Sequence, residues 1–288
     1  MSENKKYRSR SGKERFTRAV IYIFLSVLCA IWLIPFIYLV FQAFRGESRS
    51  MVTYIFPKEW SFDNFIFLST KTDFWHWYLN TLTIALFNAV LQSAIVLCVA
   101  YALSRMRFKG RKFLMNLMLI LGMFPGFLSM IATYFILKLF GLTSENSIPG
   151  LILIYAASSG MGYYIAKGFF DTIPKSLDEA ARIDGASRSR VFFRIIMPMA
   201  KPIIIYTIMM AFIAPWGDFM YASLITFGHE EAYNVAVGLY RWLDKEHISN
   251  YFTVFCAGGL LVSVPVTALF MALQKYYVEG VTGGAVKG

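Results

Sequence analysis

The sequence predicts an all-α polytopic membrane protein with six transmembrane helices. Three observations predict this class. Hydrophobic residues make up 57% of the 288 residues and charged residues only 16%, whereas soluble domains are usually nearer a quarter charged. The apolar residues also gather in charge-poor stretches, and a helix needs roughly 20 such residues to cross a bilayer. These stretches predict spans at about 19–43, 77–103, 113–137, 149–167, 202–226 and 251–274.

The Lys and Arg residues predict how the spans are oriented. Most of the 28 basic residues lie in the two terminal tails and in the connections after the second and fourth spans. Cytoplasmic loops carry this excess, so we expect both termini in the cytoplasm and the protein in a bacterial cytoplasmic (inner) membrane. The charges are scattered among the spans rather than gathered on one face, which argues against nucleic-acid binding.

Three regions follow from this pattern. They are a basic cytoplasmic tail at 1–18, a transmembrane domain at 19–274 and a cytoplasmic C-terminal tail at 275–288. The first apolar run far exceeds the about 7–15 residues of a cleavable signal, and no A-x-A site follows it, so it is expected to be retained. The three cysteines, Cys29, Cys98 and Cys256, all lie within spans. Their spacing suits neither a disulfide nor a metal, so they are interpreted as small buried apolar residues.

Several spans contain Gly or Pro, such as Pro125 and Gly126 in the third span and Pro215 and Gly217 in the fifth. These residues kink helices or let them approach closely, which suits a bundle that opens and closes. They are also commoner in membrane helices in general, so both interpretations remain open. Among the outward loops, the acidic one at 227–250 is long enough to contact something outside the membrane.

The connection at 168–201 is the most informative segment, because it is polar yet patterned like two helices. Pro174 breaks the preceding helix, and Ser176 with Glu179 forms a capping box for a helix at about 177–184. Gly185 supplies a left-handed stop, and Ser187 can cap a second helix. The apolar face of the first helix is expected to comprise Leu177, Ala180 and Ala181. The residues alone leave two roles open: contact with another protein, or an amphipathic pair resting on lipid headgroups.

A resemblance decides between these roles. Glu179-Ala180-Ala181-Arg182-Ile183-Asp184-Gly185-Ala186, with Ile196-Met197-Pro198 ten positions later, resembles the EAA loop of ABC importer permeases. Met197 replaces the commoner Leu, a change that keeps volume and polarity alike. Further runs resemble the carbohydrate subgroup, and most closely the second permease subunit of maltose/maltodextrin-type importers. These runs are Trp77 to Thr81, Tyr101 to Arg111 and Gln274 to Gly288.

The resemblance implies a type I ABC importer permease fold with a cytoplasmic coupling helix between the fourth and fifth spans. It implies as partners a second, non-identical permease, a cytoplasmic ATPase dimer and an extracellular or periplasmic sugar-binding protein. The residues implied to contact or shape the ATPase joint are Glu179, Ala180, Ala181, Asp184, Gly185, Ala186 and Pro198. The C-terminal residues implied at the ATPase interface are Gly283, Gly284 and Lys287.

The expected function is that of a permease subunit in an ATP-driven sugar or oligosaccharide importer. It would form half of the translocation pathway and work by alternating access. The chain contains no G-x-x-x-x-G-K-[ST] motif, so ATP and Mg²⁺ are expected in the partner ATPase, with no cofactor, metal or catalytic residue in this chain. Sugar sites combine aromatic platforms with hydrogen-bonding groups. The candidates for the substrate pathway are Tyr134, Tyr155, Tyr163, Trp216 and Tyr221.

Two alternatives belong to other classes. An ion-coupled secondary transporter needs ionisable groups within its spans. Asp218 is the only acid in a predicted span, and it is interpreted as a polar residue at the membrane interface. A membrane-embedded enzyme would need catalytic motifs, but the sequence contains neither H-E-x-x-H nor G-x-S-x-G, and its three histidines lie in or beside outward loops.

Overall fold

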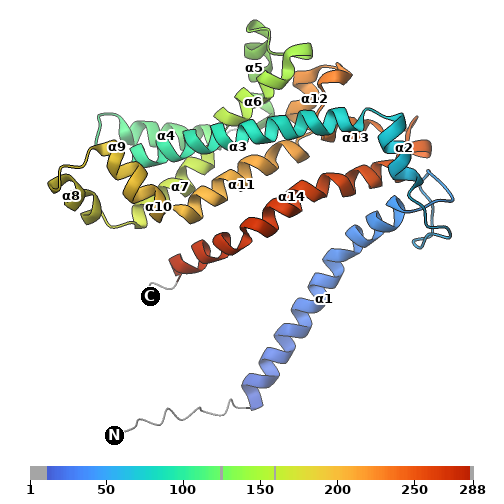
Figure 1. Ribbon diagram of the computed structural model, residues 1–288, viewed down its shortest axis with the longest axis horizontal. Helices are drawn as coiled ribbons and strands as arrows, with labels where there is room; N and C mark the ends of the chain where they lie inside the picture. The colour runs from blue at the N-terminus through green and yellow to red at the C-terminus, as the bar shows by residue number, and fades with distance from the viewer. Residues whose placement is uncertain (1–11, 124–125, 159, 286–288) are drawn as a thin grey trace.

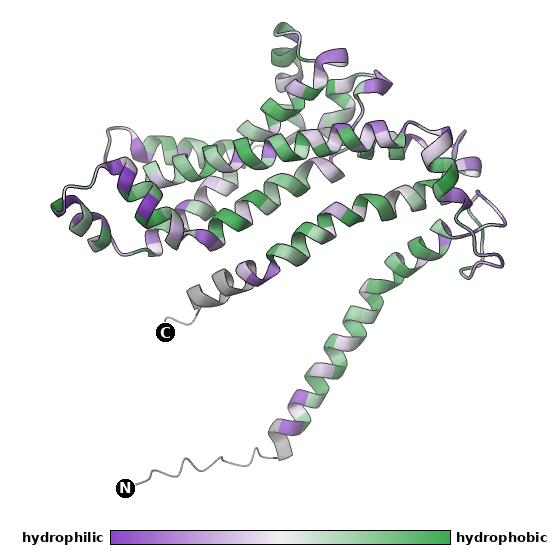
Figure 2. Cartoon of the chain, in the orientation of Figure 1, coloured by the Kyte–Doolittle hydropathy of each residue, from purple (hydrophilic) through white to green (hydrophobic). Residues whose placement is uncertain are grey.

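The structure, a computed structural model, describes residues 12–123, 126–158 and 160–285. Helices dominate these ranges (Figure 1), and the extended pairing described within them is a single isolated bridge between Arg45 and Trp60. The predicted all-α class is therefore confirmed for the described part of the chain. Figure 2 shows that hydrophobic residues cover most of the long helices, as a lipid-facing surface requires.

Three helices are long and apolar enough to cross a membrane without interruption. They are α1 (Gly12–Ala43), α3 (Phe74–Arg105) and α14 (Ile248–Ala285). They match the first, second and sixth predicted spans. The helix α14 runs beyond the predicted end of its span and contains Gly283 and Gly284, whereas Lys287 lies outside the described residues.

The other three predicted spans are each divided into two helices. The third comprises α4 (Arg111–Gly122) and α5 (Gly126–Leu139). The fourth comprises α6 (Ser147–Ala157), preceded by the short η1 (Ser144–Asn146), and α7 (Gly160–Thr172), with a bend of 41°. The fifth comprises α11 (Lys201–Gly217) and α12 (Met220–Thr226). By length and composition the structure has three spans, or up to five when bent pairs are joined, so the count of six stays a prediction.

The breaks bear on the two interpretations of Gly and Pro. The helix α11 ends at Gly217, so this glycine marks an interruption. In contrast, α14 passes through Pro265 and α1 through Pro35. Whether the interruptions serve an opening and closing of the bundle stays a prediction.

The central helix of the bundle is α3, which packs against α11, α7 and α6. The helix α14 packs against α11 on one side and α1 on another. Figure 1 shows two ends of this bundle: α8 (Ser176–Ile183) lies at one, and α2 (Asp63–Lys71) and α13 (Val235–Arg241) lie at the other. We call these the α8 end and the α13 end. The first turns of α1 and the last turns of α14 both point toward the α8 end.

The helix α1 diverges from the bundle and exposes most of its apolar side chains (Figure 1), among them Trp32 with 72% of its surface exposed. A group of buried polar contacts, the α1 latch, fixes its last turn at the α13 end. The Arg45 side chain donates to Gln42 Oε1 over 2.9 Å and to the carbonyl oxygens of Tyr54 and Ile55 over 3.0 Å each. The orientation of α1 therefore depends on this latch and on α14.

Asn64 joins the α1 latch to α14. Its Nδ2 donates to the carbonyl oxygens of Ala43, over 3.0 Å, and Arg45, over 2.8 Å, while its Oδ1 accepts a 2.8 Å bond from Thr253 of α14. The side chain of Glu47 closes the latch on its outer side. Burial acts to raise the pKa of Glu47, but backbone donors at Lys58 and Glu59 and the charge of Arg45 outweigh it and lower this pKa to about 2.

We expect Asn64→Ala to lower the stability of the folded chain by about 2 kcal/mol, because it leaves two buried carbonyls and one buried hydroxyl without a partner. The measurement is the thermal unfolding midpoint of the purified, detergent-solubilised protein, which should fall by about 5 °C. Asn250→Ala, an exposed asparagine at the start of α14, is the matched control and should leave the midpoint in place. An equal midpoint for both variants would show that the latch does not hold α1.

Candidate functional site

The segment at 168–201 forms the helix pair that the sequence predicts. The first helix is α8, and the second consists of α9 (Arg188–Val191), a π-helical turn η2 (Phe192–Ile196) and α10 (Met197–Met199). This second helix meets α11 at 83°, directly before Lys201. Figure 1 shows α8 at the tip of the bundle, beyond the ends of α3 and α7.

The predicted capping box at the start of α8 is wrong. Lys175 already has helical angles, with φ −69° and ψ −21°, so the turn begins one residue earlier than expected. Its carbonyl oxygen accepts from the amides of Asp178, over 3.0 Å, and Glu179, over 3.2 Å. Ser176 therefore lies inside the helix rather than at its cap. From this position its hydroxyl cannot accept a hydrogen bond from the amide of Glu179.

The predicted end of α8 is confirmed. Gly185 has a φ of +79°, which an L side chain rarely adopts. The amide of Ala186 donates back to Ala181 O over 2.9 Å, as in a glycine-terminated helix. Two residues later Ser187 Oγ accepts from the amide of Arg190 over 3.3 Å and caps α9, as predicted. Both signals act locally, which explains why they could be predicted from sequence.

The predicted apolar face of α8 lies only partly against the bundle. Ala181 is buried with Phe170, Val191 and Ile196 in the second of two apolar clusters of the bundle. Leu177 and Ala180 are exposed, because the residue that shares the buried face with Ala181 is the acid Asp178. The small-residue face is thus split between the bundle and the surface.

Most of the residues implied at the ATPase joint lie on the exposed surface of α8 and the turn after it, whereas Pro198 lies in α10. Ala186 is half-buried and Ala181 is buried, whereas the others are exposed, namely Glu179, Ala180, Asp184, Gly185 and Pro198. Ile183 lies among them with 87% of its surface exposed, an unusual place for a large apolar side chain. The exposed part of α8 therefore combines an acid, small residues and one apolar anchor, which suits contact with another protein.

An ion pair that the sequence did not reveal fixes α8 to the bundle. Arg105, the last residue of α3, reaches to 3.3 Å from Asp178 Oδ2. The same guanidinium donates through Nη2 to the carbonyl oxygens of Phe170, over 2.9 Å, and Ile173, over 2.7 Å, at the end of α7. One side chain therefore joins α3, α7 and α8. The nearest signal in the sequence was Arg105 within the run at 101–111, but nothing there indicates its partner.

A second charged group lies beside this ion pair. Asp171 of α7 accepts from Ser104 Oγ over 2.6 Å and pairs with Lys167 at 2.5 Å. The hydrogen bond from Ser104 and the ion pair with Lys167 thus fix this carboxylate between α3 and its own helix.

The five candidate pathway residues do not form one site. Tyr155, Trp216, Tyr134 and Tyr221 belong to the first apolar cluster of the bundle, whereas Tyr163 belongs to the second. Trp216 packs edge-on against Tyr78 with ring centroids 5.1 Å apart. Their role in sugar passage stays a prediction.

Asp218 lies at the centre of this group, at the break between α11 and α12. The Tyr155 hydroxyl donates to its carboxylate, which also accepts from the amide of Tyr221 over 3.1 Å. Asn234 donates to the carbonyl oxygen of Asp218 over 2.7 Å. Because Tyr155 lies three residues before the break between α6 and α7, this hydrogen bond joins two helix breaks.

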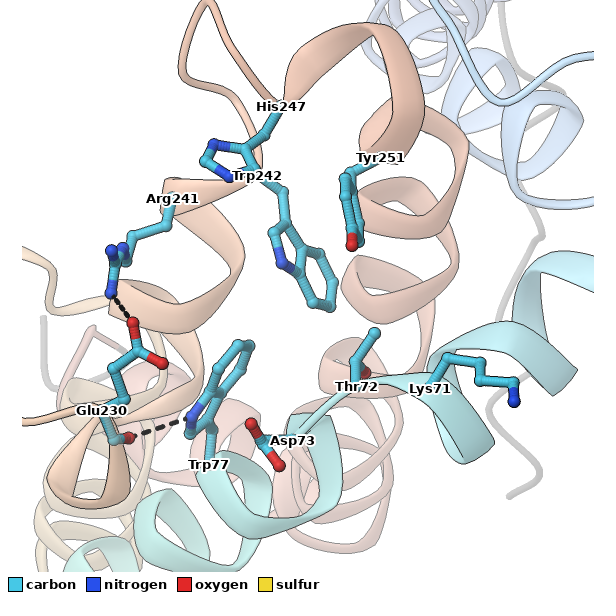
Figure 3. A pocket seen from close by; sticks show the side chains of 9 residues that line it. All are labelled: Lys71, Thr72, Asp73, Trp77, Glu230, Arg241, Trp242, His247 and Tyr251. Carbon is cyan, nitrogen blue, oxygen red and sulfur yellow. Dashed lines mark hydrogen bonds and ion pairs between the residues drawn. The ribbon is translucent and has the colours of Figure 1, made fainter.

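At the α13 end, a cavity of about 210 Å³ opens between α3, α13 and the start of α14 (Figure 3). Its wall is aromatic: Trp242 stacks on Tyr251 and contacts Trp77, each at a centroid distance of 5.5 Å. Arg241 and Glu230 form an ion pair at its rim, and Trp77 Nε1 donates to Glu230 O over 3.1 Å. Trp77 and Trp242 are buried, so this wall mainly ties the 227–250 loop to α3.

Gly238 shows how closely the loop and α3 approach each other. A Cβ atom at this position would lie 2.0 Å from Cε3 of Trp77, a distance that no side chain can accept. The bulk of Trp77 thus requires a glycine here, and the fit places α13 directly against the start of α3.

An α-helical bundle whose long helices carry apolar outer faces defines the class of multi-pass membrane proteins. The family described as "Binding-protein-dependent transport system inner membrane component" matches residues 94–283. The chain therefore belongs to this family of transport permeases.

Relatives match nearly the whole chain. The galactooligosaccharides transport system permease protein GanQ of Bacillus subtilis (strain 168) is 37% identical over 93% of this chain and 94% of its own length. The maltodextrin transport system permease protein MdxG of the same organism is 35% identical over 93% of this chain and 95% of its own length. A solved structure shares the fold, with a TM-score of 0.76, 22% identity and coverage of 93% of this chain and 99% of the other. It is described as a bacterial ABC transporter involved in the import of the acidic polysaccharide alginate.

The Arg105–Asp178 pair makes a direct prediction. Asp178→Ala leaves the buried Arg105 charge without its partner, which destabilises the attachment of α8 by about 3 kcal/mol. Amide hydrogen exchange across 176–187 should become about 100-fold faster, while exchange in the middle of α3 stays slow. Asp184→Ala removes an exposed acid from the end of the same helix and is the matched control. Equal protection in both variants would contradict an anchoring role for the pair.

Proposed function

We propose that this chain is one of two permease subunits in an ATP-driven importer of oligosaccharides. The observation that carries the proposal is an exposed helix, α8, with the Glu179–Ala186 sequence, held on the bundle by Arg105. The names of GanQ and MdxG support an oligosaccharide as the transported substrate, because they specify galactooligosaccharides and maltodextrin. The two permeases would each form half of the translocation pathway.

The orientation in the membrane follows from charge. The basic excess lies in the tails and in the two connections at the α8 end, so this end faces the cytoplasm. An ATPase dimer docks there on the exposed surface of α8, and the C-terminal residues proposed to contact it are Gly283, Gly284 and Lys287. At the α13 end, the acidic 227–250 loop faces outward and receives the sugar-binding protein.

The proposed mechanism is alternating access. Closure of the ATPase dimer on ATP and Mg²⁺ moves α8, which is too firmly attached to move alone. Arg105 passes the displacement to α3 and to the end of α7, and α3 contacts most of the bundle. Sugar and nucleotide must each favour one of the two global states for this coupling to work. Within the bundle, Tyr134, Tyr155, Trp216 and Tyr221 are the proposed pathway residues near Asp218, with Tyr163 apart from them.

The alternative of an ion-coupled transporter is not supported. The relatives of this chain are permeases of binding-protein-dependent transport systems. An ion-coupled mechanism would rely on Asp218. At the helix break, its carboxylate already accepts hydrogen bonds from the Tyr155 hydroxyl and the Tyr221 amide. Its structural role accounts for its presence in a predicted span.

Glu179→Lys tests the coupling role of α8. The charge reversal lies on the exposed surface, so insertion and assembly of the bundle should be unaffected, while docking of the ATPase should weaken. We expect sugar-stimulated ATP hydrolysis and sugar uptake to fall at least about tenfold in proteoliposomes that contain the assembled transporter and its binding protein. Ser189→Lys adds a cation to neighbouring α9, outside the proposed contact, and should retain both activities. Undiminished hydrolysis and uptake in the Glu179 variant would refute the coupling role.

A further inference from the structure

A strongly basic cavity lies beside α8 and shares Glu179 with the surface proposed for the ATPase. Its volume is about 410 Å³, and it opens between α8 and the segment that links α3 to α4. Two acids, Asp178 and Glu179, line it together with six cations. The cations are Arg105, Arg107, Arg111, Lys175, Arg182 and Arg188. The cavity therefore has a net positive charge and favours an anionic ligand.

The cations of this cavity retain unused hydrogen-bonding capacity. Arg105 is buried, with 3% of its side chain exposed, and among the described residues its Nε has no hydrogen-bond acceptor. Its Nη1 lies 3.3 Å from Asp178 Oδ2, in an ion pair without hydrogen-bond geometry. Within the described ranges, the other five cations form no ion pair with a carboxylate. Buried donors of this kind are costly unless a ligand satisfies them.

An apolar pocket of about 590 Å³ adjoins the basic cavity. The two share Arg107 and Arg111, and the apolar side is formed by Phe108, Phe113 and Met115. Beyond it, α4 buries no residue against the rest of the described chain. Phe113 exposes 72% of its surface. The combined site is thus amphipathic, with cations at one side and an open apolar track at the other.

We propose that this site binds an anionic phospholipid of the cytoplasmic leaflet. The phosphate of its headgroup lies among Arg105, Arg107 and Arg111, and an acyl chain follows Phe108 and Phe113 along α4. Basic pockets between helices on the cytoplasmic side are suited to such headgroups. An acidic protein segment would satisfy the cations but would leave the apolar track unused. The proposal rests on the membrane orientation given above, and not on the sugar or the ATPase.

The site would make the lipid a structural contact of the coupling helix. Arg107 lies in the α3–α4 link and Arg111 begins α4, whereas Arg182 belongs to α8 and Arg188 to α9, so one phosphate brings both walls of the cavity together. An occupied site therefore holds α8 against α3 in addition to the Arg105–Asp178 pair. In membranes poor in anionic lipid, the cations that line the cavity would repel one another, because no phosphate would lie between them.

The test uses the purified, assembled transporter and counts retained lipids by native mass spectrometry after addition of phosphatidylglycerol or phosphatidylcholine. We expect the Arg107→Gln and Arg111→Gln double variant to lose retention of phosphatidylglycerol by at least about tenfold, with no change for phosphatidylcholine. The Arg190→Gln and Arg194→Gln double variant removes equal charge from the same end, outside the cavity, and should retain the lipid. Equal retention by both double variants would overturn the proposal.

Two further outcomes are decisive. The Phe108→Ser and Phe113→Ser double variant should also weaken retention of phosphatidylglycerol, since an acyl chain needs the apolar track. Unchanged retention would contradict the placement of an acyl chain there and overturn the amphipathic site. If the arginine variant instead loses the ATPase subunit and keeps the lipid, the cavity is a protein interface and the proposal is wrong. Neither readout depends on sugar transport, so failure here is distinct from failure of the coupling role of α8.

Discussion

The buried guanidinium of Arg105 is the contact on which the α8 end depends. The last carbonyls of a helix lack internal partners, and those of Phe170 and Ile173 at the end of α7 are satisfied by Arg105. The same side chain attracts Asp178 and so determines which face of α8 turns inward. Because a charge buried this deeply tolerates few alternative positions, the exposed residues of α8 are presented in one defined orientation.

Local signals in the sequence predicted local structure well. Gly185 and Ser187 were read correctly because a left-handed turn and a helix cap depend only on neighbouring residues. The capping box failed because the chain after Pro174 is already helical at Lys175, one residue before the expected cap. The anchoring of α8 could not be predicted, since apolar periodicity cannot reveal that Asp178 pairs with a cation some 70 positions away along the chain.

The length of the apolar stretches in the sequence predicted where helices lie but not where they break. The stretches at 113–137, 149–167 and 202–226 are apolar enough to suggest uninterrupted spans, yet each contains two helices. Gly217 precedes a break, whereas Pro265 does not, so residue type alone does not locate one. A helix breaks stably inside a bundle only where other groups satisfy the freed backbone, and those groups come from distant segments, as Asn234 does for Pro215 O and Asp218 O.

The helix breaks and the contacts of Arg105 divide the bundle into a stiff part and parts that can bend. The helix α3 is continuous from the α13 end to Arg105, so a displacement of α8 reaches its whole length. The interruptions of α6–α7 and α11–α12 lie together, joined by the hydrogen bond from Tyr155 to Asp218. In the proposed transport cycle, motion that enters through α8 would therefore be absorbed at these paired breaks, since continuous helices packed on both sides resist bending. A pathway that opens beside α3 at this level would place Tyr155 and Tyr221 at its wall, which gives a physical reason for their position as pathway residues.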